Sequence, residues 1–353
     1  MSRLLDQPSG GMTYAQAGVS IAAGEESVER IKSVVASTAR PGVLGGIGGF
    51  GGLFALDVKR FAEPVLVASA DGVGTKLEVA RQVGRYDSVG VDLVAMLVDD
   101  LVCVGAEPLF LLDYVAVGAL DPPVLEELVQ GIARGCQLAN TALLGGETAE
   151  HGGVMKPDDL DVAGFAVGVV ERGRELGPHL VRDGDVLIGL ASPGLRSNGY
   201  SLARSVLATS HAAWLEPAYD GASRTLGDEL LVESVIYAPA VLALIGAAPG
   251  DVHGCAHITG GGITGNVVRI LPDDLDAVID MTSFATPEIF FEIQRRGRVS
   301  AQEMVKTFNC GVGMVIAVAA PVAHRALDVL RAVGVGAEII GAVQSGSGRV
   351  VLT

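Results

Sequence analysis

The segment GVDLVAMLVDDLVCVGAE, residues 90–107, constrains the fold more than any other part of this chain. It predicts a helix at about residues 88–105 that is apolar on almost every side yet carries three aspartates. Asp92 and Asp99 are seven residues apart and share one face, while Asp100 lies about 100° further round. A buried carboxylate without a partner is costly, so a metal ion, a Lys or Arg, or an exposed edge must compensate. We expect Mg²⁺ to serve at least one of the three and Asp99 to be solvated.

The remaining pattern of strands and helices favours an α/β protein of the α+β type with mixed sheets. Strands are expected at 64–70, 108–118, 162–171 and 185–192, with a short strand that opens into a loop at 141–150. Further helices are expected at 25–40, 124–138, 287–296 and 323–333. Because strands and helices do not alternate strictly, a doubly wound sheet is disfavoured. A polar stretch with Gly and Pro at 171–182 predicts a boundary between domains 1–174 and 175–353.

Charge and composition exclude several classes of protein. The formal net charge of −16 argues against a general nucleic-acid binder, which needs a basic face. The four cysteines are far apart and are expected to be small buried hydrophobic residues. The N-terminal residues lack the apolar core of a signal peptide, and the longest apolar stretch is well short of the roughly 20 residues that span a membrane. We therefore expect a soluble, cytoplasmic protein without nucleic-acid or membrane partners.

The stretch SADGVGTKLEVA, residues 69–80, predicts a phosphate site. A strand that ends in Asp71 is followed by Gly72 and Gly74, and then by Thr75 and Lys76 at the start of a helix. Exposed amides, a hydroxyl and a cation all suit phosphate oxygens, and Asp71 could hold Mg²⁺ against them. The alternative is a β-turn whose aspartate caps the next helix. It is not a P-loop, because the lysine is misplaced.

A glycine-rich stretch at residues 45–52 is a weaker signal. Gly46, Gly48 and Gly51 fit the spacing GxGxxG, but no apolar strand leads into them and a strand rather than a helix follows. A flexible cover over a nucleotide and a plain hinge loop are about equally good interpretations.

Polar residues at the ends of other elements remain open to two interpretations. Glu147 follows a strand and two glycines and is either a ligand or base, or an ordinary loop acid. Ser197 and Asn198 stand at a helix start, where they bind an anion or simply cap the helix. His257 precedes three glycines and is either part of a second anion site or a structural histidine. Asn309 is expected to be structural.

Taken in order, these stretches resemble those of the phosphoribosylformylglycinamidine cyclo-ligase family, the aminoimidazole ribonucleotide synthetases of de novo purine synthesis. The resemblance runs from residue 14 to about residue 318, and DGVGTK and GGETAE are its most specific parts. The stretches that carry it are YAQAGVSI, GGIGGFGGLFAL, DGVGTKL, GVDLVAMLVDDLV, GAEPLFLLDYVA, GGETAE, DVAGFAVGVVE, SNGYSL, HITGGG and TFNCGVGM.

The resemblance implies a homodimer of two-domain subunits, with a β-barrel formed across the dimer by strands of both N-terminal domains. It implies ATP, Mg²⁺ and formylglycinamidine ribonucleotide as ligands. ATP would phosphorylate the formamide oxygen, and the amidine nitrogen would then attack that carbon. This closes the imidazole ring and releases ADP and phosphate.

The resemblance also assigns roles to single residues. Asp71, Asp100 and Glu147 would bind the metal, and Lys32 would contact the phosphates. Residues for the nucleotide would be Gly48, Gly49, Phe50, Gly51, Gly72, Gly74, Thr75 and Lys76. Residues for the ribose phosphate of the substrate would be Ser197, Asn198, Gly199, His257, Thr259, Gly260 and Gly261.

The chain departs from the family pattern at four motif positions. Arg196 replaces a histidine, Ser20 an aspartate and Val235 an arginine, and HGG at 151–153 stands where Pro-Gly is usual. Arg196 remains a candidate catalytic residue that donates to phosphate, and we hypothesise that it supplies the charge lost at Val235. Two alternatives stay open: another ATP-dependent phosphotransferase of the wider superfamily, and a nucleotide-binding relative that has lost catalysis.

Overall fold

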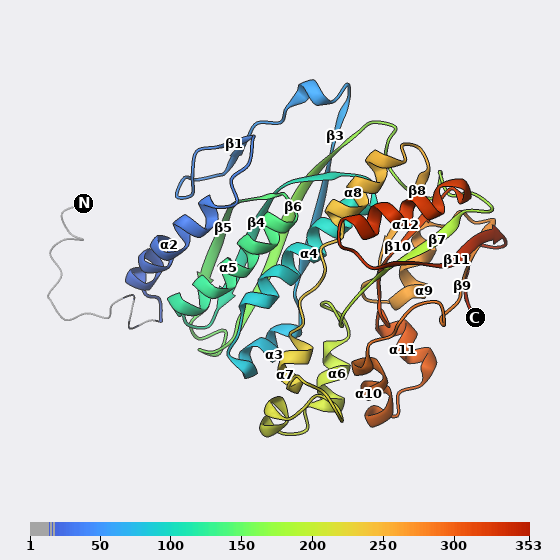
Figure 1. The fold of residues 1–353 in the computed structure, drawn as a ribbon. Coiled ribbons are helices and arrows are strands. Elements are labelled where there is room, and N and C mark those ends of the chain that lie inside the picture. Colours follow the sequence, from blue (N-terminus) through green and yellow to red (C-terminus); the bar gives the residue numbers. More distant parts are fainter. Residues whose placement is uncertain (1–13, 15, 17) are drawn as a thin grey trace, which may run out of the picture.

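The computed structural model describes residues 14, 16 and 18–353. The chain forms two α/β domains, each built on one mixed sheet, as the sequence predicts (Figure 1). Elements of the N-terminal domain are α2 (Ile21–Ala36), β1 (Val43–Leu44), β2 (Leu53–Phe54), β3 (Pro64–Gly72), α3 (Lys76–Val83), α4 (Asp87–Cys103), β4 (Glu107–Val117), α5 (Pro122–Leu138), β5 (Ala142–Glu150) and β6 (Leu160–Glu171).

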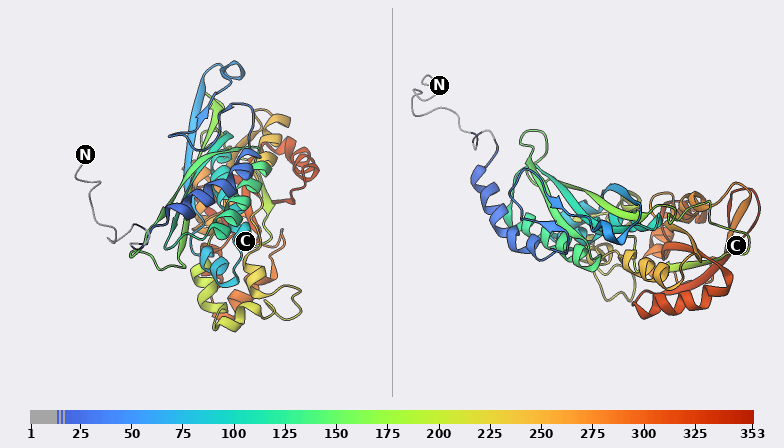
Figure 2. Two further views of the ribbon diagram at one scale, coloured as in Figure 1. Left: turned by 90° about the vertical axis from the view of Figure 1, so that its left-hand side faces the viewer. Right: turned by 90° about the horizontal axis from the view of Figure 1, so that it is seen from above.

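The N-terminal sheet has helices on one face and none of the described helices on the other. Its strand order is β3-β6-β4-β5, with β4 and β5 parallel and the other pairs antiparallel. Helix α4 packs on β3 and β6, α5 packs on α4, and α2 packs on α5 (Figure 2). On the opposite face Leu66, Tyr114 and Phe165 are exposed, because alternate residues of a strand point to opposite faces.

The C-terminal domain holds a six-stranded sheet in the order β12-β9-β11-β7-β10-β8, antiparallel except for β12 and β9. Helix α12 contacts β7, β11 and α8, while α9 contacts β8. Its elements are β7 (Val186–Ala191), α6 (Tyr200–Leu207), α7 (Leu226–Leu230), α8 (Ala238–Ala247), β8 (Val252–His257), α9 (Gly262–Val267), β9 (Leu275–Ile279), α10 (Glu288–Gly297), α11 (Ala301–Thr307), β10 (Val312–Val318), α12 (Ala323–Ala332), β11 (Ala337–Ser345) and β12 (Val350–Leu352).

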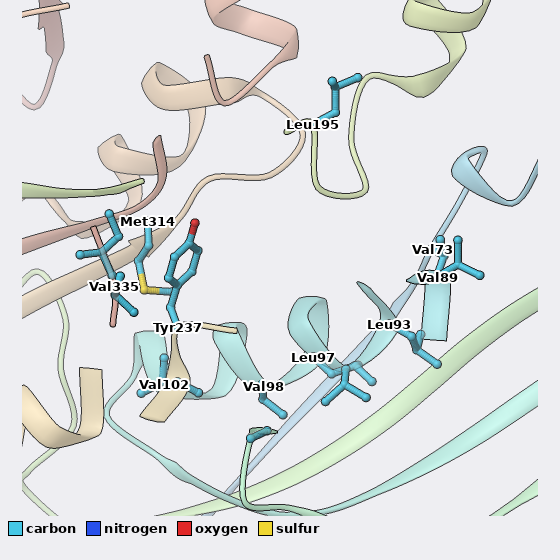
Figure 3. Packing of buried hydrophobic residues seen from close by; sticks show 14 of the residues in the cluster. Val73, Val89, Leu93, Leu97, Val98, Val102, Leu195, Tyr237, Met314 and Val335 are labelled. Atoms are coloured by element: carbon cyan, nitrogen blue, oxygen red, sulfur yellow. The ribbon is translucent and has the colours of Figure 1, made fainter. Parts of the chain in front are cut away.

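Helix α4 is the centre of the whole molecule. Every residue from Ser88 to Asp99 is buried, as expected for a helix that is apolar on almost every side. It contacts the N-terminal sheet and α5, and it also contacts α8 and β8 of the C-terminal domain. Figure 3 shows Leu93 and Val102 along this helix, with Tyr237 of the C-terminal domain beside Val102. One continuous cluster of buried apolar residues therefore joins the two domains.

A glycine allows the close packing of α4 against α5. A Cβ atom on Gly90 would lie 2.4 Å from the Leu128 carbonyl oxygen and 2.4 Å from the Ile132 nitrogen, which are closer than atoms can approach. Any side chain at this position would push the two helices apart.

Some expectations about single elements were wrong. The first helix begins at Ile21, four residues before the predicted start, because the side chain of Ser20 accepts a hydrogen bond from the Ala23 amide and caps it. The strand expected to open into a loop continues as β5 to Glu150, hydrogen-bonded to β4 along its length. Within the described part of the chain, no helix has both the length and the apolar character needed to cross a membrane.

Candidate active site between the two domains

Four segments meet where the domains adjoin: the end of β3 with its turn, the end of α4, the corner before α6, and the loop after β8. Thr75 Oγ1 in the turn lies 3.1 Å from Ser201 Oγ in the first turn of α6. A Cβ atom on Gly260 would lie 3.4 Å from Asn198 Oδ1, so the corner and the loop are neighbours. The fold thus brings together four stretches that the sequence analysis singled out.

Asp71 and Asp100 form the acidic part of this site. Crowding by protein atoms raises the pKa of the Asp71 carboxyl, and the negative charge of Asp100 raises it further. A cation between them would relieve this repulsion, and carboxylates are ligands that Mg²⁺ prefers. Among the described residues no group of three or more His, Cys, Asp or Glu side chains is arranged to hold a metal ion. The pair therefore suits a metal ion that takes its other ligands from phosphates and water.

A chain of hydrogen bonds leads from the buried core to Asp100. Arg196 Nη2 donates to Asp99 Oδ2 at 2.7 Å and to His257 Nε2 at 3.0 Å. An arginine has no acceptor, so Nε2 of His257 must accept and the proton of the neutral ring resides on Nδ1. This N–H donates to Asp100 Oδ1 at 2.9 Å. The imidazole is therefore a fixed donor that orients the Asp100 carboxylate.

Two predictions about residues in this hydrogen-bond network were wrong. Asp99 is not solvated: it is completely buried, and its Oδ1 also accepts from the amides of Tyr237 and Ala238 at 2.8 and 2.9 Å. Arg196 is only 1% exposed and donates to the carbonyl of Val235 at 2.7 Å. Its guanidinium neutralises Asp99 and has no open path to an anion, so it does not replace a cation lost at position 235.

Lys76 likewise does not supply a cation to the phosphate turn. Its ammonium group is completely buried, 2.5 Å from Asp92 Oδ2, and donates to the Val232 carbonyl at 2.8 Å. Its nitrogen also lies 5.6 Å from the centre of the Tyr200 ring. Burial lowers the pKa of Lys76, and the charge of Asp92 opposes that change. The turn keeps its amides and Thr75 as candidate phosphate donors.

A cavity of about 310 Å³ opens beside Asp100 and His257, and its wall includes a cationic side chain that sequence reasoning missed. Arg269 lines this cavity and is exposed, one turn after Asn266. Asn266 is buried and donates to the carbonyl oxygens of Thr259, Gly260 and Gly262, which fixes the shape of the glycine loop. The spacing of Asn266 and Arg269 within NVVRI was the available signal, because residues three apart lie on one helix face.

The structure separates Glu147 from the other two predicted metal ligands. Asp71 pairs with Gly164 of β6, which pairs with Asp113 of β4, which in turn pairs with Gly146 of β5. Glu147 is the next residue on β5 and thus three strands away from Asp71, roughly 14 Å at the usual strand spacing. A single chain therefore cannot bring Asp71, Asp100 and Glu147 to one metal ion.

The glycine-rich stretch borders a second cavity, of about 360 Å³, which Glu147 also lines. Gly48 and Gly49 face it, whereas Phe50 is fully exposed. Lys32 lines an adjoining cavity with Gly45 and Gly46. The remaining predicted residues are less telling: Ser197 Oγ is buried, and Asn309 donates to the Gly194 carbonyl at 2.9 Å, the structural role predicted for it.

Asp113, which also lines this second cavity, was missed by sequence reasoning. Burial raises the pKa of its carboxyl to about 7. The signal was present: within the predicted strand 108–118, Leu111, Asp113 and Val115 share one face, and the two neighbours are completely buried.

Comparison with known proteins agrees with this architecture. Residues 57–170 match the N-terminal domain of AIR synthase related proteins, and residues 182–353 match the C-terminal domain of the same group. Thiamine-monophosphate kinase from Stenotrophomonas maltophilia K279a has a similar structure, with a TM-score of 0.67 and 19% identity over 93% of this chain and 95% of that one.

Two further solved structures are similar. Hydrogenase maturation protein HypE in complex with ATP has a TM-score of 0.64 and 18% identity over 92% of this chain and 90% of its own. T. maritima PurL complexed with AMPPCP has a TM-score of 0.53 and 15% identity over 98% of this chain and 49% of that one. At such identities the likeness shows a shared fold.

Proposed function

Since this chain belongs to the AIR synthase related family through both of its domains, we propose that it closes formylglycinamidine ribonucleotide to aminoimidazole ribonucleotide with ATP. The observation that carries the proposal is the meeting of Asp71, Asp100 and His257 between the domains. The family-specific motifs DGVGTK, SNGYSL and HITGGG all border this place. Two of the similar structures, of HypE and of PurL, contain ATP or its analogue AMPPCP.

The residues divide the work between the two ligands. Asp71 and Asp100 would hold Mg²⁺, which neutralises phosphate charge and so makes the terminal phosphoryl group easier to transfer. Thr75 and the amides of residues 72–75 would bind phosphate oxygens. His257 holds one oxygen of Asp100 and leaves the other free for the metal. None of these residues needs to form a covalent intermediate.

Arg269 is proposed to bind the ribose phosphate of the substrate. It is the exposed cation in the cavity beside Asp100 and His257, and Asn266, which also lines this cavity, is hydrogen-bonded to the loop 259–262. An arginine binds a phosphate through two parallel hydrogen bonds, which are stronger than those between neutral groups. Arg269 thus takes the role of phosphate donor that was expected of Arg196.

A homodimer is proposed because the open face of the N-terminal sheet is apolar. Leu66, Tyr114 and Phe165 are exposed there, and a second copy of the sheet would cover them by closing a barrel. A twofold axis can build such a barrel in two ways, by pairing like edges or by pairing β3 with the partner's β5. The second way brings Asp71 of one subunit to the edge that carries Glu147, and we propose this arrangement.

A second candidate is a nucleotide-binding relative that has lost catalysis. It is favoured by Ser20, Arg196 and Val235, which replace residues usual in the cyclo-ligase family. Such a protein would bind ATP without forming the product.

The test is an assay with ATP, Mg²⁺ and formylglycinamidine ribonucleotide that follows aminoimidazole ribonucleotide and phosphate together. We expect equal amounts of both from the native protein, none from Asp71→Ala, and native rates from Asp220→Ala, which removes an exposed carboxylate elsewhere. Binding of ATP without either product would support the second candidate. Phosphate release with a different acceptor would point to another phosphotransferase of the family.

A further inference from the structure

Two cysteines from different domains lie side by side next to the proposed active site. Cys103 is the last residue of α4 in the N-terminal domain, and Cys255 lies in β8 of the C-terminal domain. Both line the cavity of about 310 Å³ that Arg269 also lines. Both are free thiols, and their side chains form a hydrogen bond with each other.

The contact between α4 and β8 on one side of the pair explains this placement. Residues three apart lie on one face of a helix, so Asp100 and Cys103 share a face of α4. Alternate residues lie on one face of a strand, so His257 and Cys255 share a face of β8. The hydrogen bond of 2.9 Å from His257 Nδ1 to Asp100 Oδ1 joins these two faces. The cysteines are the next pair along the same contact.

A second contact lies on the other side of the pair, through the segment 176–177. The first amide of this segment donates to the carbonyl of Val104 at 3.2 Å, and the second donates to the carbonyl of His253, also at 3.2 Å. Val104 directly follows Cys103 in the sequence. His253 is two residues before Cys255. The end of α4 and β8 therefore run alongside each other in opposite directions, and the two thiols lie between two fixed points.

The two thiols differ in their access to solvent. Cys103 is partly exposed, whereas Cys255 is 1% exposed. The hydrogen bond with Cys103 raises the pKa of Cys255, and burial raises it further, so Cys255 keeps its proton. A reagent that enters the cavity therefore meets Cys103 first, and Cys255 is placed to react in a second step.

We propose that Cys103 and Cys255 form a reversible disulfide bond by exchange with an oxidised low-molecular-weight thiol, and that this bond lowers the activity of the adjacent site. The thiolate of Cys103 attacks one sulfur of the small disulfide, which forms a mixed disulfide and releases one small thiol. The sulfur of Cys255 then attacks that of Cys103, and a second small thiol leaves with the proton of Cys255. The two protein thiols are thereby oxidised, and the small disulfide is reduced to two thiols.

The bond would change the geometry of the proposed metal site. A covalent bond between two sulfur atoms is shorter than the contact between two hydrogen-bonded thiols, so the end of α4 must approach β8. The same two elements hold Asp100 and His257 in their hydrogen bond. A displacement of about 1 Å at a reacting group can lower the rate about a hundredfold. This effect on activity rests on the proposed function, whereas formation of the bond does not.

Mass measurement with glutathione disulfide as the probe tests the bond directly. The protein is incubated with an excess of glutathione disulfide, then unfolded and alkylated without a reducing agent. We expect the native protein to lose two hydrogen atoms and to keep two of its four thiols for alkylation. A digest should contain the peptides of Cys103 and Cys255 joined to each other, and dithiothreitol should separate them.

Three variants separate the steps of the exchange. Cys255→Ala should stop at a mixed disulfide between Cys103 and glutathione, because the second thiol is missing. Cys103→Ala should take up no glutathione, because the remaining thiols are buried. Cys310→Ala, which removes a buried cysteine elsewhere, is the matched control and should form the native disulfide. Melting curves confirm that all variants are folded.

Activity and ATP binding test the effect on the site. Oxidation should lower the rate of aminoimidazole ribonucleotide formation about tenfold or more, and dithiothreitol should restore it. Oxidation should also raise the Kd for ATP in the presence of Mg²⁺, which calorimetry measures without turnover. Cys103→Ala should keep the rate of the reduced native protein and should not respond to glutathione disulfide.

The outcomes distinguish this inference from the proposed function. If the native protein forms no product in either redox state, the proposed function fails, while the mass and the Kd for ATP still decide the inference. If all four thiols remain after exposure to glutathione disulfide and the unfolded chain reacts, the inference fails. It also fails if a different pair of cysteines is joined. A disulfide between Cys103 and Cys255 that changes neither the rate nor the Kd for ATP would overturn the effect on the site.

Discussion

Arg196 and Asp99 are 97 positions apart in the sequence, yet their side chains form an ion pair that is shut off from solvent between the two domains. Each group compensates a charge that would otherwise be buried alone. The guanidinium carbon also lies 4.7 Å from the centre of the Tyr237 ring. The pair therefore stabilises the core. It is nevertheless next to the proposed active site in the sequence, because Asp99 directly precedes Asp100 and Arg196 directly precedes Ser197.

Removing one partner of this pair should be costly. We expect Arg196→Met to lower the free energy of unfolding by about 3–5 kcal/mol, because Asp99 would remain buried and uncompensated. Adding Asp99→Asn should recover a large part of the loss. Urea unfolding of the single and double variants measures this coupling, with Arg325→Met as an exposed control. A loss below about 1 kcal/mol in Arg196→Met would show that the charge is solvated after all.

Lys76 should behave in the same way, in contrast to a phosphate-binding lysine. Lys76→Met is expected to lower the free energy of unfolding by about 3–5 kcal/mol, because Asp92 would lose its partner. The Kd for ATP, measured on the folded protein, should stay within about twofold of the native value. Weaker ATP binding of Lys76→Met with native stability would instead show that Lys76 binds phosphate.

Arg269 should matter for the substrate and little for the fold. We expect Arg269→Met to raise the KM for formylglycinamidine ribonucleotide about tenfold or more, because an exposed cation in the cavity would be lost. The KM for ATP should hardly change. Steady-state kinetics with each substrate varied in turn decides this, and an equal rise in both KM values would contradict the assignment.

Asp113 should make stability depend on pH. Its folded-state pKa of about 7 exceeds the ordinary value of 3.8, so between pH 4 and 7 the folded protein binds more protons than the unfolded chain. Stability must therefore fall as the pH rises through this range, by up to about 4 kcal/mol from this group. Asp113→Asn removes the effect, so the free energy of unfolding of this variant should rise relative to that of the native protein as the pH increases from 4 to 7. The measurement is urea unfolding of both proteins at several pH values. A difference in free energy of unfolding that stays constant from pH 4 to 7 would contradict the prediction.

The proposed dimer makes a prediction about mixtures. If Asp71 of one subunit works with Glu147 of the other, Asp71→Ala and Glu147→Ala should each be inactive alone. Mixed in equal amounts and allowed to exchange subunits, they should regain about a quarter of the native activity, since half of the dimers would carry one intact site of two. No recovery, with subunit exchange shown by mass spectrometry, would favour the barrel that pairs like edges.

The regular elements were predictable because they follow from periodicity. Helix α4 and the strands around it have patterns that local sequence determines, and the structure places them as predicted within a few residues. The two adjacent glycines before Glu147 suggested a loop instead of a strand. Hydrogen bonds to β4 overrode that local preference, which no property of the segment itself reveals.

The partners of the charged residues were harder to predict. The spacing of Asp92 and Asp99 showed that they share a helix face, but not that Lys76 and Arg196 from other elements meet that face. From the sequence we assigned both Lys76 and Arg196 to phosphate. A cation near a glycine turn can pair either with a phosphate or with a buried carboxylate, and only the fold decides between them. Asp113, by contrast, was readable from strand alternation.

The seven-residue spacing of Asp92 and Asp99 also limits how the molecule can open. Asp92 accepts from the Ser234 amide and hydroxyl, and Asp99 accepts from the amides of Tyr237 and Ala238, so α4 holds one segment of the C-terminal domain at two points. These points are roughly 10 Å apart along the helix. A hinge rotation of one domain against the other would break both attachments at once. If the protein acts as proposed, we therefore expect the glycine-rich loops, and not a rotation between the domains, to admit the substrate and release the product.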